Sequence, residues 1–557
     1  MYNQLSIRTL FLFTLIILAC WPGSTAVLSA QAIEGDPASL SGREFMVPSK
    51  EINGQMIGQE DVLMQEVGIT DPSANWDRYH RLDIGISGTV DGWAVKEQLA
   101  MPQLASAPEF LYPQSGITSP RFHGILRYEA SKGTGLTLVY PEGDAWNGKL
   151  FVTVHGSGGS FAQGTLKPWN QLLDRARPLG DLSKYERLML DKGYAVAKTQ
   201  RNASTTGDYS VKLDAGEVLE GWNLNTHTGL LLGFTRLAEN ILEARLGEKP
   251  SRTYWYGHSA GGMTARLINY KPGENLDENG DPIIDGFLND DSGGGRYLPY
   301  VEENGRNALF ETEESRRQFI KTIEVPHQLF IRHRSRAGVP EWISPVYIEN
   351  HRITAKILRE KGLGDKLRMY EVRGISHIGD EYLEEDQRGD ITTVRLSRLM
   401  DGLIDLLDNW VDRNITPPAT RSDLLELGDT DGDGTNENEA LALPELACPL
   451  GVYHPYPPGM GAGGVNWTAF APFDGRSLEP QDGRGVFVDM NLNRYLDARE
   501  SVDQAWLRLG LLKPGEKLDR ETYRACVEAA VDRLKKTGFL TERAAKLYVE
   551  QASQLDL

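Results

Sequence analysis

The sequence predicts an α/β fold in which a mostly parallel central sheet is flanked by helices. Three observations support this prediction. Strand patterns alternate with helical patterns along the chain, which is typical of parallel strands joined by crossover helices. One strand pattern runs directly into a helical pattern through the glycine-containing turn 257–262. Another, Leu150–Val154, ends at the glycine-rich segment 155–159.

The expected elements follow from apolar periodicity. Helical spacing of apolar residues predicts helices over 224–246, 263–270 and 392–412, and Pro417 and Pro418 follow the last of them. The expected strands lie at 136–140, 150–154, 194–199, 252–256, 283–288, 328–332 and 367–372. The α/β domain is therefore expected to span 115–415, with residues 292–325 as an insertion between two of its strands.

The two ends of the chain predict further regions. Arg8 precedes an apolar run and small residues end it at Ala26, so residues 1–26 are expected to be a signal peptide, with cleavage as late as residue 32. The protein is then secreted or periplasmic, and a lipid anchor at Cys20 is the alternative. Residues 33–114 are interpreted as an N-terminal extension, and 419–557 as a C-terminal region with calcium loops and helices.

The strongest functional signal is the segment Gly257-His-Ser-Ala-Gly261. It places Ser259 in a G-x-S-x-G motif between a strand and a helix, where a tight turn lifts a nucleophilic hydroxyl above a sheet. Glycines on both sides leave room that a Cβ would fill. Ser259 is therefore the candidate nucleophile. A helix N-cap serine between packing glycines is the alternative interpretation.

Two further segments fit the same chemistry. After Val154 comes His155-Gly-Ser-Gly-Gly159, whose backbone amides at Gly156 or Ser157 can pair with that of Ala260 to form an oxyanion hole. Far downstream, Gly374-Ile-Ser-His377 follows a strand pattern, which makes His377 the candidate general base.

With these three motifs, residues 115–412 resemble the α/β-hydrolase superfamily. The chain is most similar to large secreted α/β-hydrolase-domain proteins, whose better-known relatives are esterases. The resemblance implies an α/β-hydrolase fold and a Ser-acid-His order along the chain. It also implies that 115–415 is the catalytic domain and that the insertion 292–325 forms a cap over the site. The family's usual acid position follows strand 328–332, where this chain carries Ser or Arg. Some members carry the acid one strand earlier, which favours Asp291; Asp290 and Glu341 are the alternatives.

Calcium is the expected cofactor, with a structural role and none in catalysis. The Asp-x-Asp-x-Asp-Gly segment 429–434 and the segment 489–500 space oxygen ligands as calcium-binding loops do. Position 12 of the first loop is Ala440 rather than Glu, and Arg494 of the second stands where Gly is expected. A third, poorer match consists of Asp277, Asn279, Asp281 and Asp285, with Leu288 where the final Glu is expected. The expected ligands are Asp429, Asp431, Asp433, Asp489, Asn491, Asn493, Tyr495, Asp497 and Glu500.

Composition limits the partners. The chain has 59 Lys and Arg against 78 Asp and Glu, a net charge of −19 without a basic stripe, so nucleic-acid binding is not expected. The apolar runs are shorter than a membrane span, so no transmembrane segment is expected. Cys448 and Cys526 either form a disulfide or remain two buried thiols.

The predicted function is that of a secreted serine hydrolase acting on small-molecule or polymer carboxylic esters through an acyl-enzyme. A peptidase or amidase with the same triad is one alternative, because the fold does not set the substrate. A non-catalytic, calcium-dependent binding protein is the other, favoured by the missing acid at its usual position.

Overall fold

The structure is a computed structural model, and its described residues lie in one compact unit, Ser41–Leu557. They comprise the strands between 51 and 141 and the ranges 143–155, 182–200, 203–212, 218–226, 228–270, 275–292, 302–303, 306–307, 313–327, 343–381, 394–454, 469–473 and 500–557, apart from gaps at 278, 376, 378, 423–424, 426, 429–436, 438 and 556.

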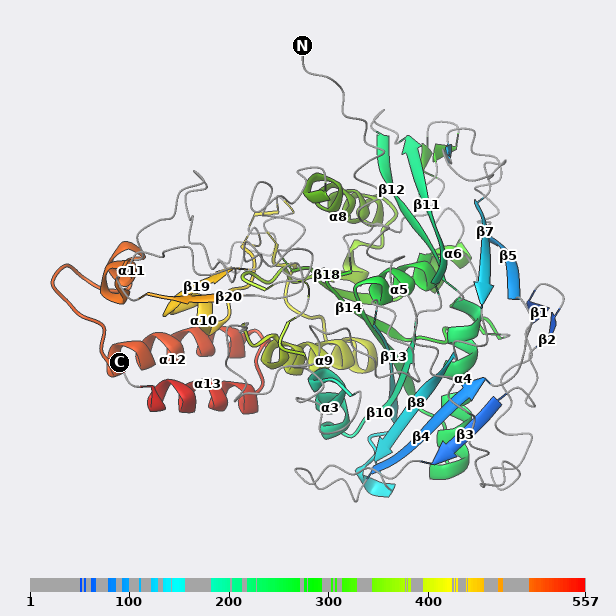
Figure 1. Cartoon of the computed structure of the whole chain (residues 1–557), viewed down its shortest axis with the longest axis horizontal. Coiled ribbons are helices and arrows are strands. Elements are labelled where there is room, and N and C mark those ends of the chain that lie inside the picture. Colours follow the sequence, from blue (N-terminus) through cyan, green and yellow to red (C-terminus); the bar gives the residue numbers. More distant parts are fainter. Residues whose placement is uncertain are drawn as a thin grey trace, which may run out of the picture. The chain divides into compact units, whose positions relative to one another are not determined.

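Among the described residues, nine strands form one sheet in the order β18-β17-β14-β13-β9-β10-β8-β4-β3 (Figure 1). The strands from β18 to β10 pair in parallel, whereas β8, β4 and β3 pair antiparallel. This confirms the expected mostly parallel sheet. The bounds are β3 Val62–Glu66, β4 Tyr79–Ile86, β8 Thr134–Pro141, β9 Lys149–His155, β10 Ala195–Gln200, β13 Arg252–His258, β14 Gly286–Asp290, β17 Lys321–Val325 and β18 Leu367–Met369.

Helices cover both faces of this sheet. On the central strand β13, Tyr254 donates to Asp408 of α9 at 2.6 Å, while its neighbour Thr253 donates to Glu239 of α4 at 2.7 Å. Because successive side chains of a strand point to opposite faces, α9 and α4 lie on opposite sides of the sheet. Helix α3 packs beside α9 and α5 beside α4. The bounds are α3 Lys184–Asp191, α4 Thr228–Leu246, α5 Ala260–Tyr270 and α9 Leu396–Arg413.

Other elements are shorter or lie around this core. The paired small strands are β1 Glu51–Ile52 with β2 Gln55–Met56, β5 Trp93–Leu99 with β7 Phe122–Tyr128, β6 Phe110–Leu111 with β11 Ala203–Lys212 and β12 Val218–Thr226, β15 Glu302–Glu303 with β16 Arg306–Asn307, and β19 Gly451–His454 with β20 Ala469–Pro472. The remaining helices are η6 Gly143–Ala145, α6 Glu313–Gln318, α8 Ile343–Glu360, η8 Gly364–Lys366, α10 Pro444–Ala447, α11 Val502–Arg508, α12 Arg520–Lys536 and α13 Glu542–Gln554.

The cap prediction is wrong at its C-terminal end, because residues 321–325 form the core strand β17. The expected strand 328–332 lies outside the described residues. Strand β17 alternates apolar residues with Thr322 and Glu324, so the sequence does not look like a buried strand. The fold buries both polar side chains by pairing them: Asn269 donates to Thr322 at 3.1 Å, and Arg266 donates to Glu324 through two nitrogens.

The sheet also begins earlier than expected. Strand β4 pairs with β8 over its whole length, from Tyr79 opposite Pro141 to Ile86 opposite Thr134, and β3 pairs with β4. Part of the expected N-terminal extension 33–114 therefore extends the central sheet itself. Antiparallel pairing lets a segment join an existing sheet edge through main-chain hydrogen bonds, without the crossover helix that joins parallel strands.

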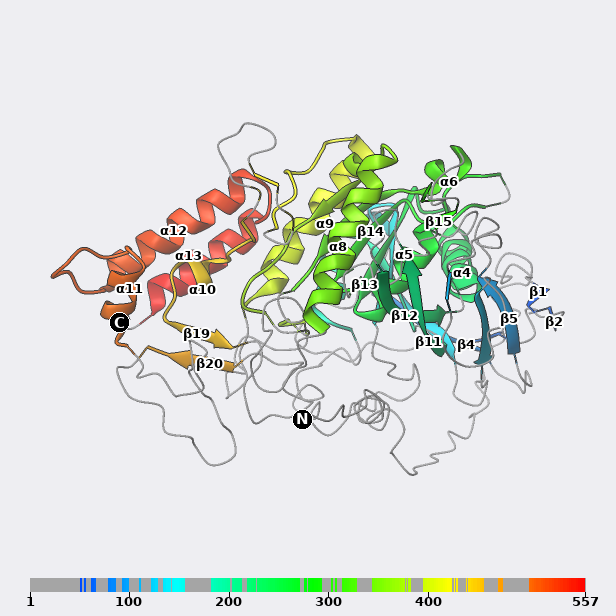
Figure 2. The ribbon, with the colours of Figure 1, turned by 90° about the horizontal axis from the view of Figure 1, so that it is seen from above.

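The C-terminal helices share a hydrophobic core with α9, and Figure 2 shows α12 and α13 lying side by side. A Cβ at Gly402 of α9 would lie 2.3 Å from the carbonyl oxygen of Phe539, so only glycine admits the turn between these two helices. Close by, Thr541 and Arg543 both donate to the buried carboxylate of Asp401. The predicted C-terminal region therefore packs as part of the same core.

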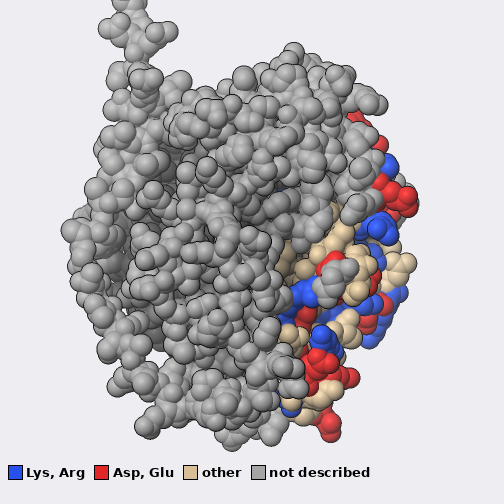
Figure 3. Space-filling view, turned by 90° about the vertical axis from the view of Figure 1, so that its right-hand side faces the viewer, with Lys and Arg blue, Asp and Glu red and all other residues tan. Residues whose placement is uncertain are grey.

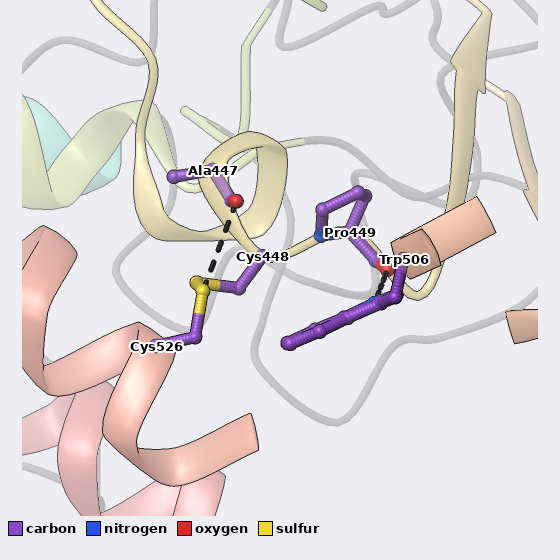
Figure 4. Close-up of a disulfide and its surroundings, with 5 residues drawn as sticks. All are labelled: Ala447, Cys448, Pro449, Trp506 and Cys526. Carbon is purple, nitrogen blue, oxygen red and sulfur yellow. Dashed lines mark hydrogen bonds between the residues drawn. A yellow bond between two sulfur atoms is a disulfide. The ribbon is translucent and has the colours of Figure 1, made fainter. Parts of the chain in front are cut away.

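A disulfide joins Cys448 to Cys526, so the open question of the two cysteines is settled in favour of the bond (Figure 4). Cys448 follows α10, and Cys526 lies in α12. Trp506, which is fully buried, donates its indole N–H to the carbonyl of Pro449 at 2.8 Å. The segment after α10 is thereby attached to both α11 and α12.

None of the helices in the described part of the chain combines the length and apolar character that a membrane span needs. Figure 3 shows acidic and basic side chains interspersed over the described part of one face. This mixture agrees with a composition in which both charge signs are abundant.

Candidate active site

Ser259 lies at the junction of β13 and α5, in the turn that the sequence motif predicts. Its φ is 55°, a left-handed conformation that a non-glycine residue adopts only under constraint. Its backbone N–H donates to the carbonyl of Asp290 at 2.9 Å, which ties the turn to the end of β14. The hydroxyl therefore projects from the carboxyl end of the parallel strands, directly before the N-terminus of a helix.

Three glycines allow the helix to approach this closely. A Cβ at Gly261 would lie 1.9 Å from the carbonyl oxygen of Val154, at the end of β9. One at Gly257 would lie 2.5 Å from the backbone of Gly261, and one at Gly262 would lie 2.3 Å from Ser292. Since real Cβ contacts do not become so short, the first turn of α5 can lie against β9 and β14 only with glycine at these positions.

His377 lies between Ser259 and Asp291. Its Nε2 is 2.8 Å from the Ser259 hydroxyl, and its Nδ1 is 2.5 Å from Oδ2 of Asp291. The side chain of His377 is 16% exposed and that of Asp291 only 4%, so the base is open to a substrate while the acid is shielded from water. The structure thus brings together the predicted nucleophile, base and acid.

The segment that leads to His377 is held on both sides. Val372 forms parallel bridges with His327 and with Leu441. Leu441 donates its N–H to the carbonyl of Glu371 at 2.7 Å and accepts from Arg373 at 3.2 Å. Because Leu441 belongs to the C-terminal region, that region adds a strand-like edge beside the histidine loop.

The structure describes two of the three acid candidates, Asp290 and Asp291, and they have different partners. Asp291 directly follows β14, with φ at 39°, and contacts His377. Asp290 is the last residue of β14, and its carboxylate contacts His258 and His327 instead. Glu341 lies outside the described residues. The geometry therefore favours Asp291, one strand before the position that the family usually uses.

The oxyanion-hole prediction can be followed only in part. Ala260 is the first residue of α5, so its backbone N–H has no partner within the helix. Gly156 and Ser157 lie outside the described residues. Strand β9 ends at His155, directly opposite His258 in the parallel register. The chain therefore leaves β9 beside the residue that precedes Ser259.

A group of buried polar residues beneath the triad was not anticipated from the sequence. Oδ2 of Asp290 is 3.0 Å from Nδ1 of His258 and accepts from the Tyr256 hydroxyl at 3.0 Å, and Oδ1 is 2.8 Å from Nε2 of His327. All four side chains are at most 2% exposed. The consecutive Asp290 and Asp291 were the available signal, since two neighbouring buried carboxylates need separate partners.

These contacts determine the charge of Asp290. Burial would raise its pKa, but His327 and the hydrogen bond from His258 lower the pKa well below its usual range, so the carboxyl is ionised. Burial likewise lowers the pKa of His258, which favours a neutral ring. A carboxylate only accepts hydrogen bonds, so His258 donates through Nδ1 and His327 through Nε2.

The expected calcium loops lie mostly outside the described residues, including Asp429, Asp431, Asp433 and the stretch from Asp489 to Asp497. At the border of the first loop, the N–H of Glu437 donates to the carbonyl of Gly428 at 3.2 Å. Glu500, the expected last ligand of the second loop, instead forms an ion pair with Arg508.

The third, poorer calcium match does not form a site. Asp277 accepts hydrogen bonds from the backbone amides of its own turn at Asn279 and Asp281. Asp285, the expected distant ligand, accepts instead from the backbone N–H of Thr253 at 2.8 Å, at the start of the sheet. Among the described residues, no cluster of three His, Cys, Asp or Glu side chains is arranged to hold a metal ion.

The comparisons with known proteins agree with this architecture. A family model described as an α/β hydrolase domain matches residues 221–550, from β12 into α13. No curated protein matches the chain. The match includes Ser259, Asp291 and His377 and extends through most of the C-terminal region.

Several solved structures are similar at low identity. Poly(aspartic acid) hydrolase-1 from Sphingomonas sp. KT-1 is 14% identical over 44% of this chain and 88% of that chain, with a TM-score of 0.26. A carboxylesterase of Geobacillus stearothermophilus is 11% identical over 52% and 79%, with a TM-score of 0.29. A lidless α/β serine hydrolase of Xanthomonas campestris is 12% identical over 50% and 90%, with a TM-score of 0.26. Such low scores carry no argument about function.

Proposed function

Since the chain belongs to the α/β-hydrolase domain family, we propose that it is a serine hydrolase that cleaves carboxylic esters. The observation that carries this proposal is the hydrogen-bonded series from Ser259 through His377 to Asp291, with distances of 2.8 and 2.5 Å. A hydroxyl, an imidazole and a shielded carboxylate in this order are the parts of a nucleophilic triad.

Each group then has a defined task. The Ser259 hydroxyl attacks the ester carbonyl while Nε2 of His377 accepts its proton. Asp291 accepts the hydrogen bond from Nδ1, which fixes the tautomer and stabilises the imidazolium. The backbone amide of Ala260, together with that of Gly156 or Ser157, stabilises the oxyanion. His377 returns the proton to the leaving alcohol, and water, activated by the same histidine, releases the acid from the acyl-enzyme.

The geometry weakens the case for a non-catalytic protein. That alternative rested on the missing acid after the expected strand 328–332. Asp291 supplies a carboxylate to His377 from the neighbouring strand end instead. Esterases and amidases can use the same triad, so an experiment has to determine whether the leaving group is an alcohol or an amine.

A substrate panel tests this proposal. The purified mature chain is assayed with p-nitrophenyl acetate, butyrate and octanoate and with matched p-nitroanilides, beside Ser259→Ala. We expect ester hydrolysis that the substitution abolishes, and the preferred acyl length measures the acyl pocket. Hydrolysis of anilides alone would replace the ester proposal with an amidase. Ester hydrolysis that survives Ser259→Ala would refute the assigned nucleophile.

We also propose secretion, through the signal peptide at 1–26, and structural calcium in the loops 429–434 and 489–500. The disulfide supports the first, because such bonds persist in oxidising compartments. The ligand spacing in the sequence supports the second. N-terminal sequencing of the exported protein tests secretion, with the mature chain expected to begin between residues 27 and 33.

A further inference from the structure

The buried group beneath the triad contacts both the acid and the base of the proposed mechanism. Asp290 is the residue at its centre, and its two oxygens accept from side chains of different strands: His258 at the end of β13 and His327 just beyond β17. The three residues are called the Asp290 clamp below. Since all three are at most 1% exposed, water does not compete for these hydrogen bonds.

Within the clamp, His327 contacts the acid Asp291. His327 donates its backbone N–H to Oδ1 of Asp291 at 2.9 Å, while its ring holds Asp290. The N–H of Asp291 donates to the carbonyl of Val325 at 3.0 Å. These contacts leave Oδ2 of Asp291 directed at His377. They also hold a non-glycine residue at a φ of 39°, which surrounding contacts have to impose.

The second histidine of the clamp, His258, contacts the base His377. The ring of His258 lies against the ring of His377, with centroids 4.7 Å apart and planes tilted by 38°. The hydrogen bond from Nδ1 to Asp290 fixes the orientation of the His258 ring, and that ring packs against the ring of His377. The carboxylate of Asp290 therefore positions both His377 and Asp291, while its backbone carbonyl accepts from the N–H of Ser259 at 2.9 Å.

We propose that Asp290, His258 and His327 are positioning residues of the hydrolase: a carboxylate held by two histidines aligns Asp291 through one and His377 through the other. This inference rests on the proposed function, because it assigns a task relative to the triad. It assigns a role to the buried carboxylate of Asp290, which takes no part in the hydrolysis steps themselves.

The geometry offers a crossed set of conservative variants. The amide nitrogen of Asn replaces Nδ1 of a histidine, whereas that of the longer Gln replaces Nε2. Asp290 is held by Nδ1 of His258 and by Nε2 of His327. The clamp therefore predicts that His258→Asn and His327→Gln retain most of the activity. His258→Gln and His327→Asn are predicted to lower kcat by about 10- to 100-fold, the effect of losing one hydrogen bond to a buried charge, with KM little changed.

Two readouts are needed on the four full-length variants. The first is kcat and KM on the best ester, and the second is the rate at which a fluorophosphonate probe labels Ser259, which requires no ester. A purely structural role depends on side-chain volume and would rank Asn and Gln alike at both positions. The crossed ranking in both readouts supports the clamp, and the same ranking at both positions, or a change in KM alone, overturns it.

Wild-type protein and Ser259→Ala separate this inference from the proposed function. If the wild type neither hydrolyses esters nor takes the label, the proposed function fails. If the wild type is active but the crossed ranking is absent, only the clamp fails. Melting temperatures of the four variants identify any that do not fold; rates are then expressed per labelled serine, so that unfolded protein does not count as slow enzyme.

Discussion

The turns that carry Ser259 and Asp291 lie at the carboxyl ends of two adjacent parallel strands, β13 and β14, and both place a non-glycine residue at positive φ. The Ser259 turn is made possible by small neighbours, because the glycines at 257 and 261 admit close backbone contacts. The Asp291 turn is held by β17 and the residues just beyond it, through the carbonyl of Val325 and the backbone N–H of His327, whose ring contacts Asp290. The same conformation can thus be specified locally or at long range.

The largest effect should come from filling the space at the Ser259 turn. In Gly261→Ala the new Cβ would meet the carbonyl of Val154 at 1.9 Å, so β9 and α5 have to separate. We expect at least a 10²-fold loss of kcat/KM, the order found when reacting groups shift by about 1 Å. The measurement is ester hydrolysis, with folding checked by circular dichroism.

Gly280→Ala is the control for this substitution. Gly280 also has positive φ, but nothing lies within 4 Å of its Cβ position. It should lose about 1 kcal/mol of stability and keep its activity. If Gly261→Ala were equally harmless, the account of a turn that requires glycine would be wrong.

The second effect concerns the turn held at long range. Asp291→Asn keeps a residue that tolerates the left-handed conformation but removes the charge that faces His377. We expect kcat to fall by about 10²–10⁴-fold with the fold retained. Asp285→Asn, just before the other end of β14, is the matched control and should leave kcat near the wild-type value. Equal activity of Asp291→Asn and wild type would exclude Asp291 as the acid.

These two turns also show how far the sequence predicts the site. Ser259 could be identified because the glycines beside it in the sequence indicate a tight turn between a strand and a helix. His377 could be identified because it follows a strand near the end of the domain. Asp291 was only one of three candidates, since nothing beside it in the sequence indicates the turn. The contacts that select it come from His327, which is 36 residues away in the chain.

The same reason explains the errors in the fold. Strand β17 was not predicted: it alternates polar with apolar residues, and Arg266, the buried partner of Glu324, is 58 residues distant. The strands β9, β10, β13 and β14 were predicted within a few residues because apolar and aromatic residues predominate in them, although some of their polar side chains, such as Thr153 with Glu186, also pair over long distances in the chain. The sequence pattern therefore locates strands in which apolar residues predominate and misses β17, in which polar and apolar residues alternate.

A smaller effect tests the buried polar surroundings of the Asp291 turn. Burial, followed by the charges of Asp290 and Glu186, raises the pKa of Glu381 from 4.5 to about 8. The folded protein then holds a proton that the unfolded chain releases above pH 4.5, so this group lowers stability as the pH rises from about 4.5 to about 8.

Glu381→Gln removes this titration. We expect its melting temperature to fall less steeply than that of the wild type between pH 5 and 8, so that the variant is relatively more stable at pH 8. Thermal unfolding across this pH range makes the comparison. Parallel curves for the two proteins would show that Glu381 titrates normally.

The smallest effect concerns loops held by an ion rather than by glycine or by side chains. If calcium occupies the loops 429–434 and 489–500, EDTA should lower the melting temperature by roughly a few degrees while kcat below the transition stays the same. Asp433→Asn with Asp489→Asn should reproduce the shift and remove the response to EDTA. An unchanged melting temperature in EDTA would argue against bound calcium.

The central claim is that the two strand-end turns bring Ser259 to a histidine that activates it. The most direct test is to label the purified chain with a fluorophosphonate probe, measure the intact mass and locate the adduct by peptide mapping. One adduct on Ser259, lost in Ser259→Ala and strongly slowed in Asp291→Asn, is the predicted result. A folded protein that takes no label, or takes it at another residue, would contradict the account.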